Sequence, residues 1–561
     1  MSCMSNSSFS DLRLAFIPLD DRPCCWQLAK HLAQAVDLGL ELPPDEFWRG
    51  GDKRCEGVVN VFSEKLTAWV AERFEEGVQA LVASVDSLIY GGLTASRCPG
   101  KLEAAVPLWD DFCEKLKDRR LYLFSTVMRI APTQHTAQEV EQAGLLAAYS
   151  TWYCSNYRAD DSDEAFLTVS CEEPVHMYNS RSPLEQRAQD FARTHGFSCG
   201  LDPAFLHRYF NYRARKHLFN KHVLNSWLAT CNQGGYLAFC LDDSQSHGFN
   251  VLEAQELVEL LTSKEDGILQ LVAEPYAERG RLAEIDDAFS NVSVGVGTDE
   301  TALLMLARAV NHQADAAVHW SYEGAQEQVG IYEGQPLKNV LESQARWARL
   351  NLTNPDDSDS SVAQIFIYAP WHRQKEAAEQ DGSADLQGRE WGGWTLAITQ
   401  ALECGQRVFL ADLAYANGGS TKLAEWLLDN GLIGRLSGYA AWNTAGNSLG
   451  TVIAWAALDA CHPQRVDDET ILSAKDRCLL ERFLDDYCYQ AVIRPKLSKE
   501  IGGTFVVLAE EDAEAVAARI ELELEPFWQR LLNGWPRETV WHHFKVKLPW
   551  RRLFEIELEL Y

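Results

Sequence analysis

The sequence predicts an α/β fold with a mostly parallel sheet, and three observations carry this prediction. Short apolar runs recur along the chain, typical of strands buried on both faces of a sheet. Amphipathic helical patterns alternate with these runs, which favours parallel strands joined by helices. About nine such runs precede roughly the last hundred residues, so we expect a (β/α)8-type barrel with one strand belonging elsewhere. Two doubly wound α/β domains sharing a cleft fit the pattern nearly as well.

The strands are expected in the order in which the apolar runs occur. They are residues 14–19, 78–85, 121–127, 236–241, 292–296, 316–322, 365–368, 408–412 and 436–442. The run at 236–241 is the clearest, because it is wholly apolar and breaks abruptly into Asp242-Asp243. A buried strand that ends in charge brings that charge to the carboxyl edge of the sheet, where α/β proteins bind ligands.

Two segments depart from the alternating pattern. Residues from about 133 to 233 carry helical patterns between two strands, a separation far longer than a normal connection, and we interpret them as a helical insertion. Residues 466–561 carry two helical patterns and then two alternating segments, which predict a β-hairpin with one polar face. The catalytic α/β domain is therefore expected at 11–465, followed by a C-terminal helical and hairpin extension.

Composition limits the possible partners. The formal net charge is −30, which would repel nucleic acid and anionic membranes. The fifteen cysteines show no C-x-x-C pair or metal-ligand spacing, and the first ten residues do not resemble a secretory signal. We therefore expect a cytoplasmic protein with reduced thiols, a small-molecule partner, and neither nucleic acid nor membrane as partner. The oligomeric state is left open.

Two acid pairs are the candidate catalytic groups. Asp242-Asp243 and Asp299-Glu300 each follow a predicted strand. Glycoside hydrolysis uses two carboxyl groups in different environments, one protonated and one ionised. The alternative is structural, since acidic side chains often cap or begin the helix after a strand.

Polar and aromatic residues at the other strand ends are candidates for binding substrate. They are Asp20, Asp21, Arg22, Asp86, Tyr90, Arg97, His247, Asn250, Asp412, Tyr415, Asn417, Trp442, Asn443 and Asn447. Aromatic rings stack on the apolar face of a sugar, and amides bond its hydroxyl groups. Turns and helix caps are the alternative for the asparagines, and a hydrogen-bonded loop position for His247.

A divalent metal is the alternative to catalysis without a cofactor. Asp20, Asp86 and Asp242, together with Asp21, His247 and Asp412, could bind such an ion if they converge. The sequence contains no H-E-x-x-H or similar fixed spacing, no Walker-type phosphate loop and no G-x-G-x-x-G after its first strand. We therefore expect no cofactor.

Six motifs carry a resemblance to a known family. They are Pro18-Leu-Asp-Asp-Arg-Pro23, Asp86-Ser-Leu-Ile-Tyr-Gly-Gly92 with Ser96-Arg97, Asp242-Asp243 with Gly248-Phe-Asn250, Gly297-Thr-Asp-Glu300, Tyr415-Ala-Asn-Gly-Gly419 and Trp442-Asn-Thr-Ala-Gly-Asn447. With them the chain resembles the uncharacterised bacterial domain-of-unknown-function family four-one-two-seven. That resemblance implies no activity.

A weaker, local resemblance is to enzymes that remove N-acetylated hexosamines with the substrate's acetamido group as nucleophile. Some of them carry Asp-Asp after a barrel strand, which would make Asp242 the orienting group and Asp243 the general acid. Others carry Gly-x-Asp-Glu, which would give those roles to Asp299 and Glu300. Both pairs lack the flanking residues typical of these families.

The leading hypothesis is therefore a glycoside hydrolase that acts on N-acetylhexosaminides. A metal-dependent hydrolase and a non-enzymatic carbohydrate-binding protein are the alternatives. The sugar, its linkage, the stereochemical outcome and the choice between the acid pairs stay open.

Overall fold

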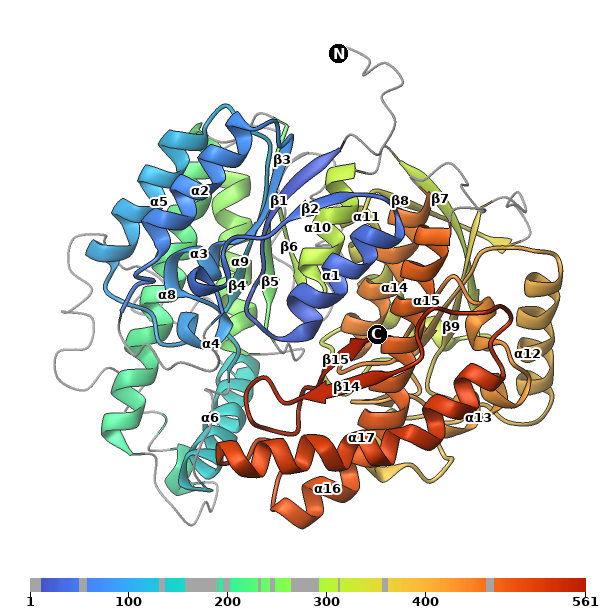
Figure 1. Cartoon of the computed structure of the whole chain (residues 1–561). Coiled ribbons are helices and arrows are strands. Elements are labelled where there is room, and N and C mark those ends of the chain that lie inside the picture. The colour runs from blue at the N-terminus through green and yellow to red at the C-terminus, as the bar shows by residue number, and fades with distance from the viewer. Residues whose placement is uncertain are drawn as a thin grey trace. The chain divides into compact units, whose positions relative to one another are not determined.

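The computed structural model divides the chain into two compact units (Figure 1). The first contains Met1–Phe16, Asp21–Leu42 and Asp299–Tyr561, and the second contains Ile17–Asp20 and Pro43–Thr298. The residues that the structure describes are 12–49, 58–130, 137–156, 188, 191–194, 202–230, 234–242, 248–263, 292–310, 313–355, 362–460 and 469–561.

Most strands lie in two open sheets. One has the order β2 (Gly39–Glu41), β1 (Arg13–Ile17), β3 (Ala80–Ser84), β4 (Leu121–Val127), β5 (Tyr236–Leu241) and β6 (Val292–Val296). The other has the order β13 (Gly438–Ala440), β11 (Val408–Asp412), β9 (Ala363–Tyr368), β7 (Ala314–Trp320) and β8 (Leu350–Thr353). In both sheets, the neighbouring strands with a defined register all run parallel. The parallel sheets confirm the predicted α/β class.

The expected eight-stranded barrel is not formed by the described residues. Six and five strands run in linear order from one sheet edge to the other, so neither sheet closes on itself. When the strands of each sheet are renumbered from one in chain order, the order of strands across both sheets begins 2-1-3-4-5. This is the strand order of one common doubly wound fold. The strand orders therefore correspond to the doubly wound alternative.

The second unit is built on β4 and β5, whose residues are all buried. Ser125 of β4 pairs with Phe239 of β5 in the middle of a six-residue parallel register. Helix α5 (Leu102–Leu116) packs against both α2 (Ser63–Glu75) and α8 (Pro203–Thr230), and Figure 1 shows α2 and α5 side by side. Helices α6 (Ala137–Asn156) and α9 (Phe249–Ser263) share an aromatic core around Tyr149.

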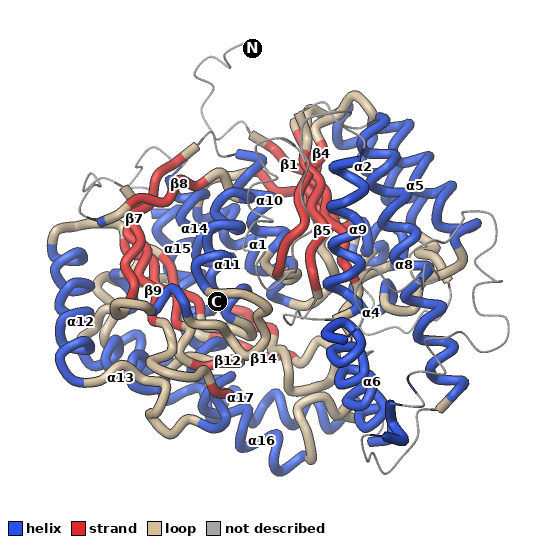
Figure 2. Tube along the Cα trace, turned by 180° about the vertical axis from the view of Figure 1, so that it is seen from behind, coloured by secondary structure: helices blue, strands red, loops and turns tan. Residues whose placement is uncertain are grey.

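The first unit is centred on helix α14 (Ala445–Ala460). Residues 445–459 of α14 are all buried, which is typical of a helix that is covered on every side. It packs on β7, β9, β11 and β13, while α12 (Gly388–Glu403) lies on the opposite side of β9 (Figure 2). Helices α10 (Thr301–Val310) and α11 (Leu337–Trp347) pack against α14, and α1 (Pro23–Ala35) packs against α15 (Glu469–Phe483).

Hydrogen bonds join the carboxyl ends of β7 and β9. The Ser321 amide donates to the Ile367 carbonyl oxygen at 3.1 Å, and the Ala369 amide donates to the Ser321 hydroxyl at 3.1 Å. The Tyr322 hydroxyl donates to the Pro370 carbonyl oxygen at 2.6 Å. Both strand ends are therefore held by side chains from the loop after β7.

The C-terminal part is mainly helical. Helix α15 continues into a π-helix, Leu484–Ile493, and then into α16 (Arg494–Ile501), before α17 (Glu510–Asn533). Strands β14 (Phe544–Lys547) and β15 (Glu557–Leu560) pair antiparallel with alternating burial, which confirms the predicted hairpin within shorter bounds. Within the described ranges, none of the helices combines the length and the apolar character needed to cross a bilayer.

Candidate active site

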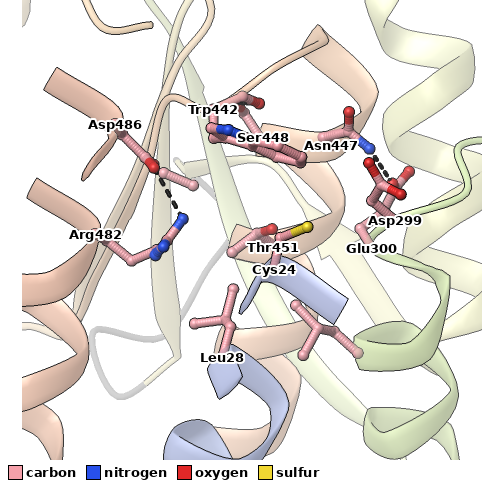
Figure 3. Close-up of a pocket in the computed structure, with 12 residues that line it drawn as sticks. Cys24, Leu28, Asp299, Glu300, Trp442, Asn447, Ser448, Thr451, Arg482 and Asp486 are labelled. Atoms are coloured by element: carbon pink, nitrogen blue, oxygen red, sulfur yellow. Dashed lines mark hydrogen bonds and ion pairs between the residues drawn. The ribbon is translucent and has the colours of Figure 1, made fainter. Parts of the chain in front are cut away.

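A small cavity in the first unit brings several predicted residues together (Figure 3). It offers about 10 Å³ to the centre of a water-sized molecule, which is close to the minimum for one water. Its lining residues come from α1, α10 and the segment before it, β13 and the loop after it, α14, α15 and the π-helix that continues α15. They are Cys24, Leu28, Asp299, Glu300, Leu303, Ala440, Trp442, Asn447, Ser448, Thr451, Arg482 and Asp486.

Glu300 is the residue before α10 and is 2% exposed. The Gln344 amide donates to its Oε1 at 2.8 Å, and the Asn447 amide donates to its Oε2 at 2.5 Å. Burial is the main cause that raises the pKa of Glu300 to about 8, and the neighbouring Asp299 and Glu333 add to it, although the Asn447 hydrogen bond opposes the rise. The raised pKa favours the protonated form of Glu300 at neutral pH.

Asp299, in contrast, is paired with a cation. Arg22, the residue before α1, donates from Nη2 to Asp299 Oδ1 at 2.6 Å and from Nη1 to Oδ2 at 3.2 Å. Both side chains are less than one-tenth exposed. A two-pronged guanidinium contact stabilises an ionised carboxylate. The site therefore places a carboxyl group with a raised pKa directly beside a carboxyl group that is paired with a guanidinium.

Asn447 links the cavity to the start of α14. The side-chain Oδ1 of Asn447 accepts from the backbone amide of Thr444 at 3.3 Å, and the backbone amide of Asn447 donates to Thr444 Oγ1 at 3.3 Å. The two residues therefore form a reciprocal capping arrangement. Asn447 therefore caps α14, as the structural alternative predicts, and the same side chain donates to Glu300. Trp442 lies in the same loop and is 7% exposed.

Arg482 and Asp486 form another part of the cavity wall, and the sequence analysis did not find them. Arg482 Nη1 donates to Asp486 Oδ1 at 2.9 Å, and the Ala441 amide donates to Asp486 Oδ2 at 2.7 Å. Burial is the largest cause that raises the pKa of Asp486 to about 7, and the Arg482 charge opposes it. The detectable signal was the Arg-Asp spacing of four in a largely apolar helical segment.

Other predicted residues of the first unit have internal roles outside the cavity lining. Asp412 accepts from the Ser420 amide at 2.6 Å, and burial raises its pKa to about 7. The Tyr415 hydroxyl donates to Asp385 at 3.1 Å.

The two predicted asparagines contact each other. Asn417 donates from its side chain to Glu376 at 2.9 Å and from its backbone to the Asn443 carbonyl oxygen at 2.7 Å, and both asparagines have a φ of 60°. Asp21 accepts from Trp550 Nε1 at 2.6 Å.

In the second unit the predicted acids have separate cationic partners. Asp86 accepts from the buried Lys216 Nζ at 2.5 Å, and Asp242 from Arg97 Nη2 at 2.7 Å. Lys216 also lies 5.5 Å from the ring centre of Tyr90, whose pKa is raised by burial and by Asp86.

The remaining predicted residues of this unit do not add to either pair. Asn250 is buried at the start of α9. Asp20 packs against Gly92, where an added Cβ would lie 3.4 Å from the Asp20 Cβ. Asp243 and His247 lie outside the described residues.

The metal alternative gains no support from these contacts. Within the described part of the chain, no three His, Cys, Asp or Glu side chains converge on a position that could hold an ion. Asp86 and Asp242, two of the proposed ligands, already bind Lys216 and Arg97. At Asp86 and Asp242 a metal ion would therefore have to share the carboxylate with these cationic partners or displace them.

The position of Glu300 depends on Gly450 of α14. A Cβ added at Gly450 would lie 2.2 Å from Glu300 Cγ and 3.0 Å from Gln344 Nε2. We expect Gly450→Ala to lower the free energy of unfolding by about 1–3 kcal/mol, because overpacking forces neighbours to move. Urea denaturation measures this, with Gly393→Ala in α12, where a Cβ meets nothing within 4 Å, as the matched control. Equal effects of the two substitutions would contradict the close approach.

Comparisons with known proteins agree with the extent of the motifs. A family model described as "Protein of unknown function (DUF4127)" matches residues 14–165 and 201–559, a range that includes every lining residue of the cavity. No curated protein and no solved structure matches the chain. The family description names no activity, so function has to be inferred from the chemistry of the residues.

Proposed function

The chain belongs to the DUF4127 family of proteins of unknown function, and from the chemistry of its own residues we propose that it is a glycoside hydrolase acting on N-acetylhexosaminides. The observation that carries the proposal is the pairing of a protonated Glu300 with a charge-balanced Asp299 in one cavity. Two carboxyl groups whose environments favour different protonation states are the requirement of glycoside hydrolysis.

Glu300 is the proposed general acid. Its proton passes to the glycosidic oxygen as the bond between that oxygen and the anomeric carbon breaks, so the leaving sugar departs as a neutral alcohol. The carbonyl oxygen of the substrate's acetamido group forms the new bond to the anomeric carbon. Water then adds to that carbon as the bond between the carbon and the acetamido oxygen breaks, and the proton that the water loses returns to Glu300. The chain's residues therefore end the cycle in their starting protonation states.

Asp299 is the proposed orienting group in this reaction. Its carboxylate accepts the acetamido N–H of the substrate and balances the positive charge that develops on that amide. Arg22 fixes the carboxylate through two hydrogen bonds, which holds its orientation. We assign these roles to Asp299 and Glu300 rather than to Asp242 and Asp243, because Asp242 is bonded to Arg97 in another unit of the chain.

The substrate contacts follow from the rest of the cavity. Trp442 supplies an aromatic ring for the apolar face of the sugar, and Asn447 and Ser448 supply polar groups. A space of about 10 Å³ accommodates one water but no sugar ring. Binding therefore requires lining side chains to move apart.

A panel of nitrophenyl glycosides tests the proposal directly. We expect release of nitrophenol from an N-acetylhexosaminide and much slower release from the matching hexoside, because only the first carries the acetamido nucleophile. Equal rates on the two would argue against assistance by the acetamido group. The absence of turnover on every glycoside of the panel would refute the hydrolase assignment.

The pH dependence gives a second test. A general acid works only while it holds its proton, and the pKa of Glu300 is raised to about 8. We therefore expect kcat/KM to be retained at neutral pH and to fall tenfold per pH unit above about pH 8. Initial rates on a nitrophenyl N-acetylhexosaminide, measured from about pH 5 to about pH 10, show the pH at which kcat/KM begins to fall. A decline that begins near pH 5 would contradict a raised pKa at the acid.

A further inference from the structure

The loop between α16 and α17 exposes three consecutive apolar side chains. Phe505, Val506 and Val507 are 59%, 40% and 50% exposed. The loop backbone is nevertheless held at both ends, since the Leu553 amide donates to the Thr504 carbonyl oxygen at 3.1 Å and the Leu508 amide donates to the Arg551 carbonyl oxygen at 2.8 Å. An exposed apolar run fixed in this way is more typical of a binding surface than of a solvated turn.

A series of ring contacts connects this loop to the cavity. Phe505 stacks on Phe554 with ring centres 5.0 Å apart and planes inclined by 28°. Phe554 in turn lies 6.0 Å from Trp442, which lines the cavity beside Asn447 and Glu300. The exposed ring is therefore separated from the cavity only by Phe554 and Trp442.

An arginine holds these rings in place. The Arg552 guanidinium lies 4.3 Å from the ring centre of Trp550, 5.6 Å from that of Phe505 and 6.0 Å from that of Phe554. Glu555 pairs with Arg552 at 2.8 Å and balances its charge. The aromatic surface is thus ordered before a ligand arrives, which lowers the entropic cost of binding.

We propose that Phe505, Val506, Val507 and Phe554, the Phe505 platform, bind a further sugar of an oligosaccharide whose terminal N-acetylhexosamine occupies the cavity. This inference rests on the proposed function, which it extends from a single sugar to a chain. A flat aromatic face flanked by apolar side chains suits the apolar face of a pyranose. The continuity with Trp442 favours a ligand that also enters the cavity. The net charge of −30 disfavours a second copy of the chain or an anionic bilayer on this surface.

Calorimetric titration with N-acetylglucosamine and its β-1,4-linked trimer tests the platform. The titrations use the full chain carrying Glu300→Gln, so that the ligand is not consumed. We expect the trimer to bind more tightly than the single sugar, and Phe505→Ala to reduce this gain about three- to tenfold, the size of one lost stacking contact. Phe505→Tyr keeps the ring and should keep the gain. Leu522→Ala, which removes another exposed apolar side chain from α17 of the same unit, is the matched control and should also keep it.

The outcomes separate this inference from the hydrolase proposal. A gain that Phe505→Ala leaves unchanged, or no tighter binding of the trimer in the first place, overturns the platform even if nitrophenyl glycosides are hydrolysed. A gain that depends on Phe505 while no glycoside is hydrolysed supports the platform and refutes the hydrolase. Sedimentation velocity covers the remaining occupant: if Phe505→Ala converts a dimer to a monomer without changing the gain, the surface binds a second copy and the inference is overturned.

Discussion

Glu300→Gln is expected to lower kcat for N-acetylhexosaminide hydrolysis by about 10²- to 10⁴-fold, the usual contribution of a general acid. The amide has nearly the same shape as the carboxylic acid, but it cannot supply a proton to the leaving oxygen. KM should change much less, because Glu300 contributes mainly to the transition state. Initial-rate measurements with a nitrophenyl N-acetylhexosaminide give both constants.

The control for this substitution is Glu333→Gln. Glu333 is also buried, and it accepts a hydrogen bond from the Gly446 amide at 2.7 Å, but it is not among the lining residues of the cavity. At neutral pH it should retain activity within a factor of about three, because Glu333 does not transfer the proton itself; the loss of its charge should only lower the pKa of Glu300. A Glu300→Gln protein that is folded by circular dichroism and as active as the unsubstituted chain would rule out Glu300 as the acid.

Arg22→Met is expected to lower the free energy of unfolding by about 3–5 kcal/mol. Removal of the guanidinium leaves the Asp299 carboxylate, with a side chain that is 9% exposed, without its cation. A buried charge that loses its partner costs more than the pair itself contributes. Urea denaturation monitored by tryptophan fluorescence measures the change.

Two further variants make this result specific. Arg22→Met combined with Asp299→Asn removes both charges and should recover a large part of the lost stability. Arg519→Met removes an arginine from an exposed pair with Glu500, whose side chains are 46% and 53% exposed, and should leave the free energy of unfolding nearly unchanged. If Arg22→Met and Arg519→Met were equally mild, the Arg22–Asp299 pair would not be buried in solution.

The strands of the sheet centres could be predicted closely from the sequence. The apolar runs at 236–241 and 408–412 coincide with β5 and β11. Such strands are buried on both faces, so their signal is local and strong. The edge strands β2 and β8, with three and four residues and partial exposure, were not predicted. Their pattern is too short and too mixed to differ from a loop.

The order of the strands could not be predicted from the sequence, because it depends on pairing between distant segments of the chain. The number of strands led us to expect a barrel, yet β7 pairs with both β8 and β9, and the chain reverses direction across the sheet at that point. A list of alternating strands and helices is compatible with either arrangement. Only the pairing partners distinguish them.

Four of the predicted site residues lie together in the structure. Asp299, Glu300, Trp442 and Asn447 line one cavity, as expected from acids and aromatic residues at strand ends. The acids of the second unit were expected at the same opening, but Asp86 and Asp242 instead form ion pairs within that unit.

Asp486 was missed because a π-helix positions it, and this wider helix has no recognised sequence signature. In an ordinary α-helical reading, Arg482 and Asp486 are one turn apart and look like a routine surface pair. Burial of both side chains, which the sequence does not reveal, is what makes them part of the cavity.

The hydrogen bonds of Ser321 have a consequence for nucleotides. Doubly wound proteins commonly hold a phosphate in the crevice where the strand order reverses, with main-chain amides as donors. In the five-stranded sheet this crevice lies between β7 and β9, where the amides of Ser321 and Ala369 are already bonded to the chain itself. A ligand phosphate in this crevice could therefore not use these two amides as donors without breaking hydrogen bonds inside the chain.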